Sequence, residues 1–396
     1  MKLNRNNIPS ILAKSVQEVW KRSVYKGYPL AVWQLPNDSS SHLIIDLRPE
    51  LQSQPFSIES SGSGFVVNPF GSAHPVTPRL IKADITFTWS KTERYETLSP
   101  TVSSSALDEF LEKIGSDRQA TGPEPIKSTR KQTPYVDLVK KGLEALVEGK
   151  MEKVVLSRYE DHQLPDTFDP FEKFEVLGKK YPNALKYLVH LPGIGTWLGA
   201  TPEELIQISD HKIFRTVALA GTQEIRSEEE IPEIAWKQKE IEEQAMVSRY
   251  IVDCFKKIRL REFEEHGPKT IKAGKLAHLK TEFVVDMSAT NTPTLGSTML
   301  ELLHPTSAVC GMPLATAMDF IKSEEGYDRS FYAGFLGPVN FQNDTNIFVN
   351  LRCMQVMGKI GRFYAGAGIT KDSDPDKEFQ ETDLKLRTMK NVIFST

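Results

Sequence analysis

The most informative stretch of this sequence is TNIFVNLRCMQVMGKIGRFYAGAGITKDSDPDKEFQETDLKLRTMKNV, residues 345–392. Its pattern predicts a strand from Thr345 to Val356, a second strand from Lys359 to Ala365 and a turn at Gly366-Ala367-Gly368. A helix from Pro375 to about Val392 should follow, because Asp374 suits the N-cap and proline suits the first helical position. The stretch therefore forms one strand, turn and helix unit.

Charged side chains share one face of this predicted helix. Glu378, Glu381 and Lys385 are spaced i, i+3 and i+7. Arg352 on the preceding strand adds a guanidinium, so the unit is suited to a divalent metal together with an anionic ligand. The alternative is an exposed Glu381–Lys385 ion pair, which contributes only about a few tenths of a kcal/mol.

Composition excludes several classes of protein. The chain has 396 residues with 49 basic and 52 acidic side chains, and no basic patch typical of nucleic-acid binding. No apolar run approaches the roughly 18 residues of a membrane span, and the first residues lack a signal core, so we expect a cytoplasmic protein. Cys254, Cys310 and Cys353 are widely spaced, which indicates buried thiols and neither disulfides nor a cysteine metal site.

The chain divides at a segment rich in proline, threonine and charge. Residues 119–134 (QATGPEPIKSTRKQTP) have no periodicity and read as a surface linker. Residues 1–118 are expected to be sheet-rich and residues 135–396 to form the catalytic part, within one compact domain overall. Strand candidates follow one another in hairpin-like pairs, so the predicted fold class is α+β with large, mostly antiparallel sheets flanked by helices.

Glu243 stands out on the helix predicted from Trp236 to Lys257. It shares a face with Val247, Ile251 and Cys254, so its carboxylate should face the interior or a cleft. A carboxylate there is either paired with a basic side chain or bound to a metal. Joined with Glu378 and Glu381 it would make an all-oxygen site of the kind that Mg²⁺ accepts.

Two further groups suit acid–base chemistry. Lys153 begins an apolar strand, where desolvation would turn its amine into a base, although a strand-edge lysine kept in water is the alternative. Glu203 ends the turn Gly199-Ala200-Thr201-Pro202-Glu203, as a proton donor held in a cleft or as an ordinary turn carboxylate. Gly221-Thr222 ends a strand whose small residues allow a ligand to approach closely, or is a simple turn.

Six motifs, in order along the chain, resemble those of the chorismate-utilising enzymes, most of all their isochorismate synthase branch. The match runs from about Tyr135 to Val392. The motifs are KVVLSR at 153–158, GATPE at 199–203, AGT at 220–222, HPTSAVCGMP at 304–313, GAGI at 366–369 and EFQET at 378–382.

The resemblance implies an α/β sandwich-like domain whose large antiparallel sheets enclose a cleft for chorismate and Mg²⁺. It implies that Lys153 is the general base that activates water, and that Glu203 is the general acid that protonates the departing hydroxyl. Glu243 and Glu381 would be metal ligands, with Glu378 ligating directly or through water. The positions implied to contact the substrate are Gly221, Thr222, His278, Ala308, Tyr332, Arg352, Gly366, Gly368 and Lys385.

Two positions distinguish between the reactions that different members of the family catalyse. Members that use ammonia, which resemble anthranilate synthase, usually have glutamine where this chain has Lys153, so water is the expected nucleophile. Salicylate synthases usually have threonine at the position of Ala308, so alanine favours stopping at isochorismate. One departure is Gln244, where the family often has histidine after the metal-binding glutamate.

These observations predict an isomerase that makes isochorismate for menaquinone or catechol siderophore synthesis. The alternatives are a salicylate synthase and a non-catalytic chorismate-binding subunit. We expect a monomer whose partner is the small-molecule substrate, with no nucleic acid or membrane.

Overall fold

The structure, a computed structural model, describes residues 16–48, 56–71, 78–90, 95–115, 132–224, 234–273 and 276–395. Within these ranges eight helices flank two large sheets, which confirms the predicted α+β class. The helices are α1 (Val16–Tyr25), α2 (Ser104–Gly115), α3 (Tyr135–Val147), α4 (Pro170–Lys180), α5 (Gln238–Lys257), α6 (Leu295–Leu303), α7 (Leu314–Glu324) and α8 (Pro375–Ile393).

The first sheet has ten strands, and every pair in it is antiparallel. In spatial order they are β14 (Gly311–Met312), β7 (Lys153–Gln163), β18 (Ile360–Ile369), β17 (Cys353–Met357), β9 (Gly195–Thr201), β8 (Leu185–Leu191), β1 (Leu30–Gln34), β2 (Ser40–Ile45), β5 (Ile85–Ser90) and β6 (Tyr95–Pro100).

The second sheet has eight strands and is also antiparallel throughout. Its order is β12 (Glu264–Ala273), β13 (Leu276–Asp286), β11 (Ile213–Glu224), β10 (Glu204–Ser209), β16 (Thr345–Val349), β15 (Phe335–Val339), β3 (Gly64–Asn68) and β4 (Arg79–Lys82).

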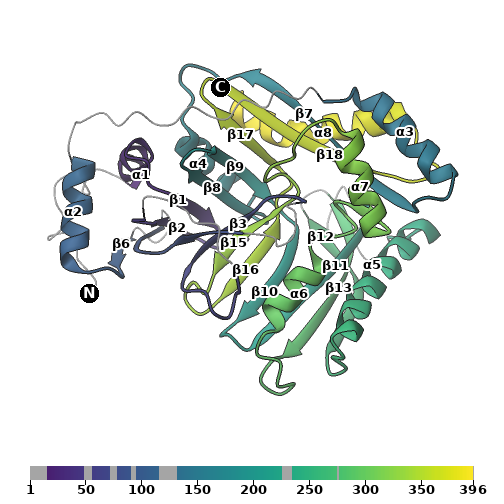
Figure 1. Cartoon of the computed structure of the whole chain (residues 1–396), viewed down its shortest axis with the longest axis horizontal. Coiled ribbons are helices and arrows are strands. Elements are labelled where there is room, and N and C mark those ends of the chain that lie inside the picture. The colour runs from purple at the N-terminus through teal and green to yellow at the C-terminus, as the bar shows by residue number, and fades with distance from the viewer. Residues whose placement is uncertain are drawn as a thin grey trace.

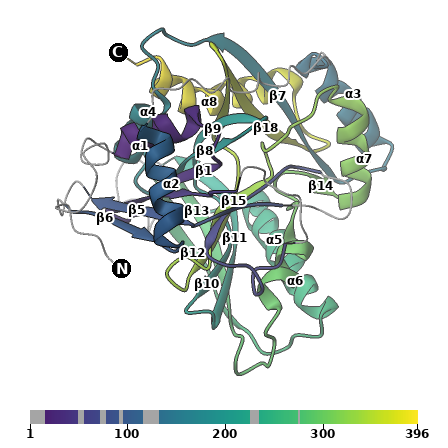
Figure 2. The ribbon, with the colours of Figure 1, turned by 60° about the vertical axis from the view of Figure 1, so that its left-hand side comes forward.

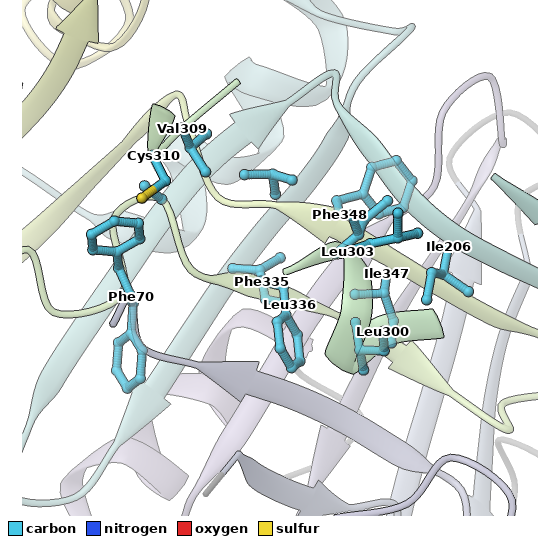
Figure 3. Packing of buried hydrophobic residues seen from close by; sticks show 14 of the residues in the cluster. Phe70, Ile206, Leu300, Leu303, Val309, Cys310, Phe335, Leu336, Ile347 and Phe348 are labelled. Atoms are coloured by element: carbon cyan, nitrogen blue, oxygen red, sulfur yellow. The ribbon is translucent and has the colours of Figure 1, made fainter. Parts of the chain in front are cut away.

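The two sheets pack face to face around the main core. Trp33 of β1 and Phe65 of β3 belong to different sheets, and their ring centroids are 5.4 Å apart. Where β16 and β15 meet α6, Leu300 and Leu303 lie beside Ile347 and Phe348, as Figure 3 shows. The residues of this core form one continuous cluster from the first sheet to α6. Strands that are covered on both faces are accordingly apolar at almost every position.

A second core covers the outer face of the first sheet. Trp20 of α1, Phe110 of α2, Phe174 of α4 and Met389 of α8 are buried there against strand residues such as Leu198. Figure 1 shows α8, in yellow, lying along β7 and β18. Figure 2 shows α5 and α6 gathered at the strands β10, β11 and β13 of the second sheet. The architecture is thus helices, sheet, sheet and helices.

Two expectations about the C-terminal stretch were wrong. The predicted strand Thr345–Val356 is interrupted, because β16 ends in the second sheet and β17 begins in the first, so that Arg352 lies on the crossing between them. Asn350 anchors this crossing, since its buried side chain donates to the carbonyl of Phe331 at 2.9 Å and accepts from the hydroxyl of Tyr187 at 2.6 Å. Gly366-Ala367-Gly368 is also not a turn but the end of β18, paired with β7.

The predicted C-terminal helix was right in its start. Asp374 is the N-cap, and its carboxylate accepts from the backbone N–H groups of Asp376 and Lys377 at 3.1 and 3.0 Å. Proline occupies the first turn, and the helix runs to Ile393.

The remaining expectations meet the structure only in part. All three cysteines are buried and unpaired, as predicted. No helix among the described residues is long and apolar enough to cross a membrane. The linker at 119–134 lies almost wholly outside the described residues, and the strands before it extend the same two sheets as those after it.

Candidate active site

Several of the predicted functional residues come together where β7 begins and β18 ends, beside α5 and α8. They are Lys153, Glu243, Gly366, Gly368, Glu381 and Lys385. Lys153 is the first residue of β7 and pairs across the sheet with Met312 of β14. Its side chain is 21% exposed, and its Nζ lies 3.9 Å from Oε1 of Glu243 on α5. Lys153 is therefore neither a free surface lysine nor buried in the core, but faces a carboxylate from another element.

Gly368 makes room for this lysine. A Cβ atom added to Gly368 would lie 3.0 Å from Cε of Lys153 and 3.7 Å from its Nζ. That separation from Cε is tighter than ordinary van der Waals contact, so only glycine leaves the lysine chain in this position without adjustment. Gly368, which was predicted to contact the substrate, thus also leaves space for the side chain of Lys153, the predicted base.

Glu203 is a partly buried carboxyl within reach of three cations. Its backbone carbonyl accepts from the N–H of Val349 at 2.9 Å, which fixes it beside the end of β16. Burial raises the pKa of Glu203, while the positive charges of Arg352, Lys153 and Lys385 oppose that shift. The carboxyl and the three basic groups therefore share one electrostatic environment.

Lys385 joins α8 to β18. Its Nζ donates to the carbonyl of Gly366 at 2.9 Å and to Oε1 of Glu381 at 2.6 Å. Burial, followed by the positive charge of Arg352, lowers the pKa of Lys385, while Glu381 and Glu378 oppose the shift. The Glu381–Lys385 pair at i,i+4 predicted from the sequence is present, and it is anchored to the sheet as well.

Tyr332 is held by an aromatic stack. Its ring lies 5.4 Å from that of Tyr364, with an angle of 9° between the planes, and Tyr364 stacks in turn on Trp197 at 5.4 Å. A Cβ on Gly366 would approach the Tyr332 hydroxyl to 2.9 Å and the carbonyl of Leu156 to 2.8 Å. Glycine at 366 thus lets the phenol and the strand lie close together. Burial raises the pKa of Tyr332.

Gly221 and His278 lie at the start of α5. The β11–β13 register shifts between Ala220 and Gln223, and Gly221 adopts a φ of +66°, a conformation that favours glycine. Nδ1 of His278 donates to the Gly221 carbonyl at 2.9 Å, which fixes its tautomer. Burial lowers the pKa of His278, opposed by that hydrogen bond. Thr222 lies in β11, but its side chain is outside the described residues.

Of the two orientations predicted for Glu243, interior or cleft, the side chain does not take the interior one. It is 47% exposed and points towards Lys153. The next residue, Gln244, is buried and donates to the carbonyl of Ala218 at 3.2 Å and to Oγ1 of Thr281 at 2.8 Å, which fastens the helix to β11 and β13. Ile251 and Cys254 are buried, as predicted for that face of α5.

The carboxylates of Glu243, Glu378 and Glu381 are suitable magnesium ligands in chemical type, but they are not clustered around a common point in this structure. Among residues 16–395 that the structure describes, no group of three or more acidic, histidine or cysteine side chains is close enough together to hold a metal. Glu381 is 49% exposed and paired with Lys385, and Glu243 faces Lys153. Half-exposed carboxylates from facing helices, together with water and ligand oxygens, remain the kind of donor set that Mg²⁺ takes.

Ala308 lies at a cavity of about 150 Å³ that also touches Glu203. The cavity is bordered by Leu303 of α6 and by Val247 and Tyr250 of α5. The residue that was expected to tune the pocket is therefore exposed beside the predicted acid.

Sequence reasoning missed the buried pair of Glu325 and Arg329. Arg329 donates to the carbonyls of Val155 at 2.7 Å and Val309 at 2.9 Å, and Glu325 accepts from the N–H of Ser157 at 2.8 Å. The pair ties β7, two residues beyond Lys153, to the loop that carries Ala308. Its signal is acid and base at i,i+4, which the sequence cannot distinguish from a surface pair.

This arrangement combines a carboxyl of raised pKa with an amine and two further cations on one site. Cations in such numbers suit a ligand bearing more than one carboxylate, since charge-assisted hydrogen bonds to carboxylates are strong and directional.

Comparison with known proteins places most of the chain within one family. The sequence pattern of the family described as "Chorismate binding enzyme" matches residues 81–394. Isochorismate synthase MenF of Escherichia coli is 26% identical over 279 residues, which is 68% of this chain but only 63% of the length of MenF. Isochorismate synthase EntC of Escherichia coli is 30% identical over 270 residues, covering 66% of this chain and 67% of EntC.

Solved structures show the same fold. The structure of MenF, the menaquinone-specific isochorismate synthase of Escherichia coli, superposes with a TM-score of 0.74 at 22% identity, over 96% of this chain and 92% of MenF. Anthranilate synthase component I of Streptococcus pneumoniae superposes with a TM-score of 0.64 at 19% identity, over 91% and 89% of the two chains.

Proposed function

The chain belongs to the chorismate-binding enzyme family, and we propose that it is a Mg²⁺-dependent isochorismate synthase, an isomerase that converts chorismate to isochorismate. The observation that carries the proposal is that the amine of Lys153 bears electrostatically on the carboxyl of Glu203, whose pKa is raised by burial and lowered by the charges of Arg352, Lys153 and Lys385. A protein that only bound chorismate would need neither an acid nor a base at this place. The similarity to isochorismate synthases supports the same reading.

In the proposed reaction Lys153 and Glu203 move the protons. Lys153 accepts a proton from the water that attacks ring carbon C2, and Glu203 gives its proton to the hydroxyl that leaves C4. The raised pKa of Glu203 supports this role, because burial favours the protonated form from which a general acid donates. One water enters and one leaves, so that the product is an isomer.

The basic groups are proposed to receive the two carboxylates of the substrate. Arg352 is suited to a bidentate grip, and Lys385 presents an ammonium already oriented by the Gly366 carbonyl. Gly366 and Gly368 would let the substrate approach the backbone of β18, while Gly221, Thr222, His278 and Tyr332 would line the far side. These roles rest on the resemblance and on the convergence of the residues.

Mg²⁺ would be held by Glu243, Glu381 and, directly or through water, Glu378. When bound, the ion would supply Lewis-acid stabilisation of the ring carboxylate as the double bonds shift. Without the metal these carboxylates face lysines, since Lys153 lies 3.9 Å from Glu243 and Lys385 lies 2.6 Å from Glu381. If Glu243 held a metal, the amine of Lys153 would be available to water.

Two residues support isomerisation over the rival reactions. Lys153 supports water as the nucleophile, where ammonia-using members usually carry glutamine. Ala308 supports release of isochorismate without elimination of pyruvate, since salicylate synthases usually carry threonine there. We propose that the product feeds either menaquinone or catechol siderophore synthesis, in the cytoplasm and with the enzyme as a monomer.

The test is a chromatogram with mass detection of purified protein and chorismate, with and without Mg²⁺. The proposal predicts a product of unchanged mass that forms only with the metal. Salicylate with pyruvate would mean that the chain is a salicylate synthase, and no product at all would favour a non-catalytic subunit.

A further inference from the structure

The cavity beside Glu203 does not stop at the predicted active site. Besides Glu203 and Ala308, its wall includes Glu204, Ile271 and Lys280 from the opposite side of the second sheet. The lining of the cavity therefore extends beyond the residues predicted to contact the substrate.

The cavity lies where the backbone pairing of β10 with β11 stops, since their paired register covers only Gln207 to Ser209 of β10. On its other side β10 pairs with β16, where Glu204 lies opposite Phe348 and Ile206 lies opposite Ile347, so Leu205 is an extra residue in a β-bulge. The hydroxyl of Thr216 on β11 donates to the carbonyl of Leu205 at 2.8 Å. A side-chain contact thus takes the place of the backbone ladder between β10 and β11 at the cavity.

Side chains from both faces of the sheet line this cavity. Leu219 of β11 is paired with Lys280 of β13, and both lie on the outer, partly exposed face. Thr216 is buried and, being an odd number of residues from Leu219, faces the opposite side, where Val247 of α5 also reaches the cavity. The cavity therefore crosses the sheet from the side of Glu203 to the outer face.

The size and lining of the cavity suit water. A water molecule takes up about 30 Å³ of liquid volume, so a space of about 150 Å³ holds a short file of them. Thr306, on the wall, has a buried hydroxyl without a hydrogen-bond partner among the described residues. Buried hydroxyls are ordinarily satisfied by protein or by water, so Thr306 points to water within the cavity.

Glu204 stands at the outer end as a group able to exchange protons. Burial raises the pKa of Glu204, with Glu282 adding to the shift and Lys280 and Arg215 opposing it. Lys280 and Glu282 are themselves paired at 3.5 Å and about one-third exposed, so this end is in contact with solvent. Glu203 at the inner end faces Arg352, Lys153 and Lys385.

We propose that the cavity is a water-filled passage through the second sheet by which Glu203 recovers its proton, with Glu204 as the proton-exchanging group at the outer end. The inference rests on the proposed function. In each turnover the C4–O bond breaks and the proton of Glu203 leaves with the hydroxyl as water, so Glu203 remains as a carboxylate. A proton from solvent then passes through Glu204 and the water file to Glu203, while Lys153 returns to solvent the proton it took from the attacking water.

The test compares Glu204→Gln with Glu264→Gln, a matched change at an exposed residue of β12 that neither lines the cavity nor bears on the pKa of Glu204. At low buffer concentration Glu204→Gln should lower kcat about tenfold with KM unchanged, less than the roughly hundredfold or greater loss from removing a direct acid. Added imidazole should restore the rate by supplying protons. Glu264→Gln should behave as the unmodified chain, and Glu203→Gln should stay inactive whatever the imidazole concentration.

Thr306→Val provides a second variant, because it removes the unsatisfied hydroxyl from the wall while keeping its shape. It should give the same loss of kcat at low buffer and the same recovery with imidazole. A Glu204→Gln enzyme with wild-type kcat at every buffer concentration would overturn the passage while leaving the proposed isomerase intact. If the unmodified chain forms no isochorismate, both proposals fall together.

Discussion

Lys153 and Glu243 show what a single position can and cannot reveal. The apolar residues after Lys153 predicted an amine drawn towards the interior, and the side chain is indeed only 21% exposed. For Glu243 the periodicity of α5 predicted a carboxylate that faces the interior or a cleft; the side chain is 47% exposed, and Gln244 takes the buried place. The sequence does not tell which of two adjacent polar residues is buried, because that depends on hydrogen-bond partners from other elements. Gln244 finds two such partners, on β11 and β13.

Lys153→Ala should abolish turnover while chorismate still binds. The expected loss in kcat is about 10² to 10⁴-fold, the usual contribution of a positioned base. Rates measured alongside calorimetric titration of substrate would separate the two effects. Lys150→Ala is the control, because that lysine is exposed and pairs only with Glu148 at the surface. Normal turnover by Lys153→Ala would remove the lysine from the reaction.

Glu381→Ala should raise the Mg²⁺ concentration needed for half-maximal activity by about tenfold or more, since each carboxylate supplies a large part of the affinity of an all-oxygen site. The measurement is a metal titration of the rate, paired with calorimetric binding of Mg²⁺ to the protein without substrate. Asp372→Ala, an exposed acid just before α8, is the matched control. An unchanged titration would take Glu381 out of the ligand set.

Among the elements, β18 departs furthest from expectation. Gly-Ala-Gly reads as a turn because glycine is common there, but here both glycines continue the strand, and their missing side chains serve close neighbours. Gly368 borders Lys153, and Gly366 borders the Tyr332 hydroxyl. The neighbours that demand glycine come from β7 and from residues near 332, which no local pattern in β18 records.

Gly368→Ala should therefore impair the reaction without unfolding the protein. Its Cβ would meet Cε of Lys153 at 3.0 Å, and a flexible lysine can move away, so the sheet survives while the amine is displaced. We expect kcat to fall about tenfold or more, as for small misplacements of a reacting group. Gly62→Ala is the control, because a Cβ there meets nothing within 4 Å. Equal kcat for the two variants, at equal thermal stability, would contradict this role for Gly368.

The crossing at Arg352 shows that the break in a strand can also depend on residues far away in the sequence. Residues 345–356 have continuous strand character, and both halves are indeed strands. The break at Asn350 to Arg352 could not be predicted, because it depends on Asn350 bonding Phe331 and Tyr187, which are 19 and 163 residues away. Helix α8, whose cap is local, was predicted to within one residue at each end.

For the molecule as a whole, the class could be predicted and the assignment of strands to sheets could not. Paired strands without alternating helices indicated antiparallel sheets, but β7 pairs with β18, about 200 residues later. Likewise β3 pairs with β15 in the second sheet while β1 joins the first. Such pairings follow from the complementarity of whole faces, which periodicity alone does not encode.

Buried neutral histidines should make the whole fold less stable in mild acid. Burial lowers the pKa of His42 and His190 to about 4 and that of His304 to about 3, against 6.5 when exposed. Below pH 6.5 the unfolded chain binds these protons and the folded chain does not, so stability present above pH 6.5 is lost as the pH falls towards 4. The loss is about 1.4 kcal/mol per pH unit for each histidine. The raised pKa of Glu203 acts in the opposite sense.

Urea denaturation at pH 7.5, 6 and 5 would measure this dependence. His190→Gln should reduce the slope by the share of one histidine, about 1.4 kcal/mol per pH unit. His211→Gln is the control, since that histidine is exposed. Equal slopes in the unmodified chain and in His190→Gln would mean that His190 is protonated in the fold.

The most direct test of the account is turnover of chorismate in water enriched in ¹⁸O, with the product resolved by mass. If Lys153 activates water and Glu203 expels the C4 hydroxyl, isochorismate must carry one solvent oxygen, and the substrate oxygen must leave as water. Product without the label, or a product that has gained nitrogen or lost pyruvate, would contradict water attack by this pair of residues.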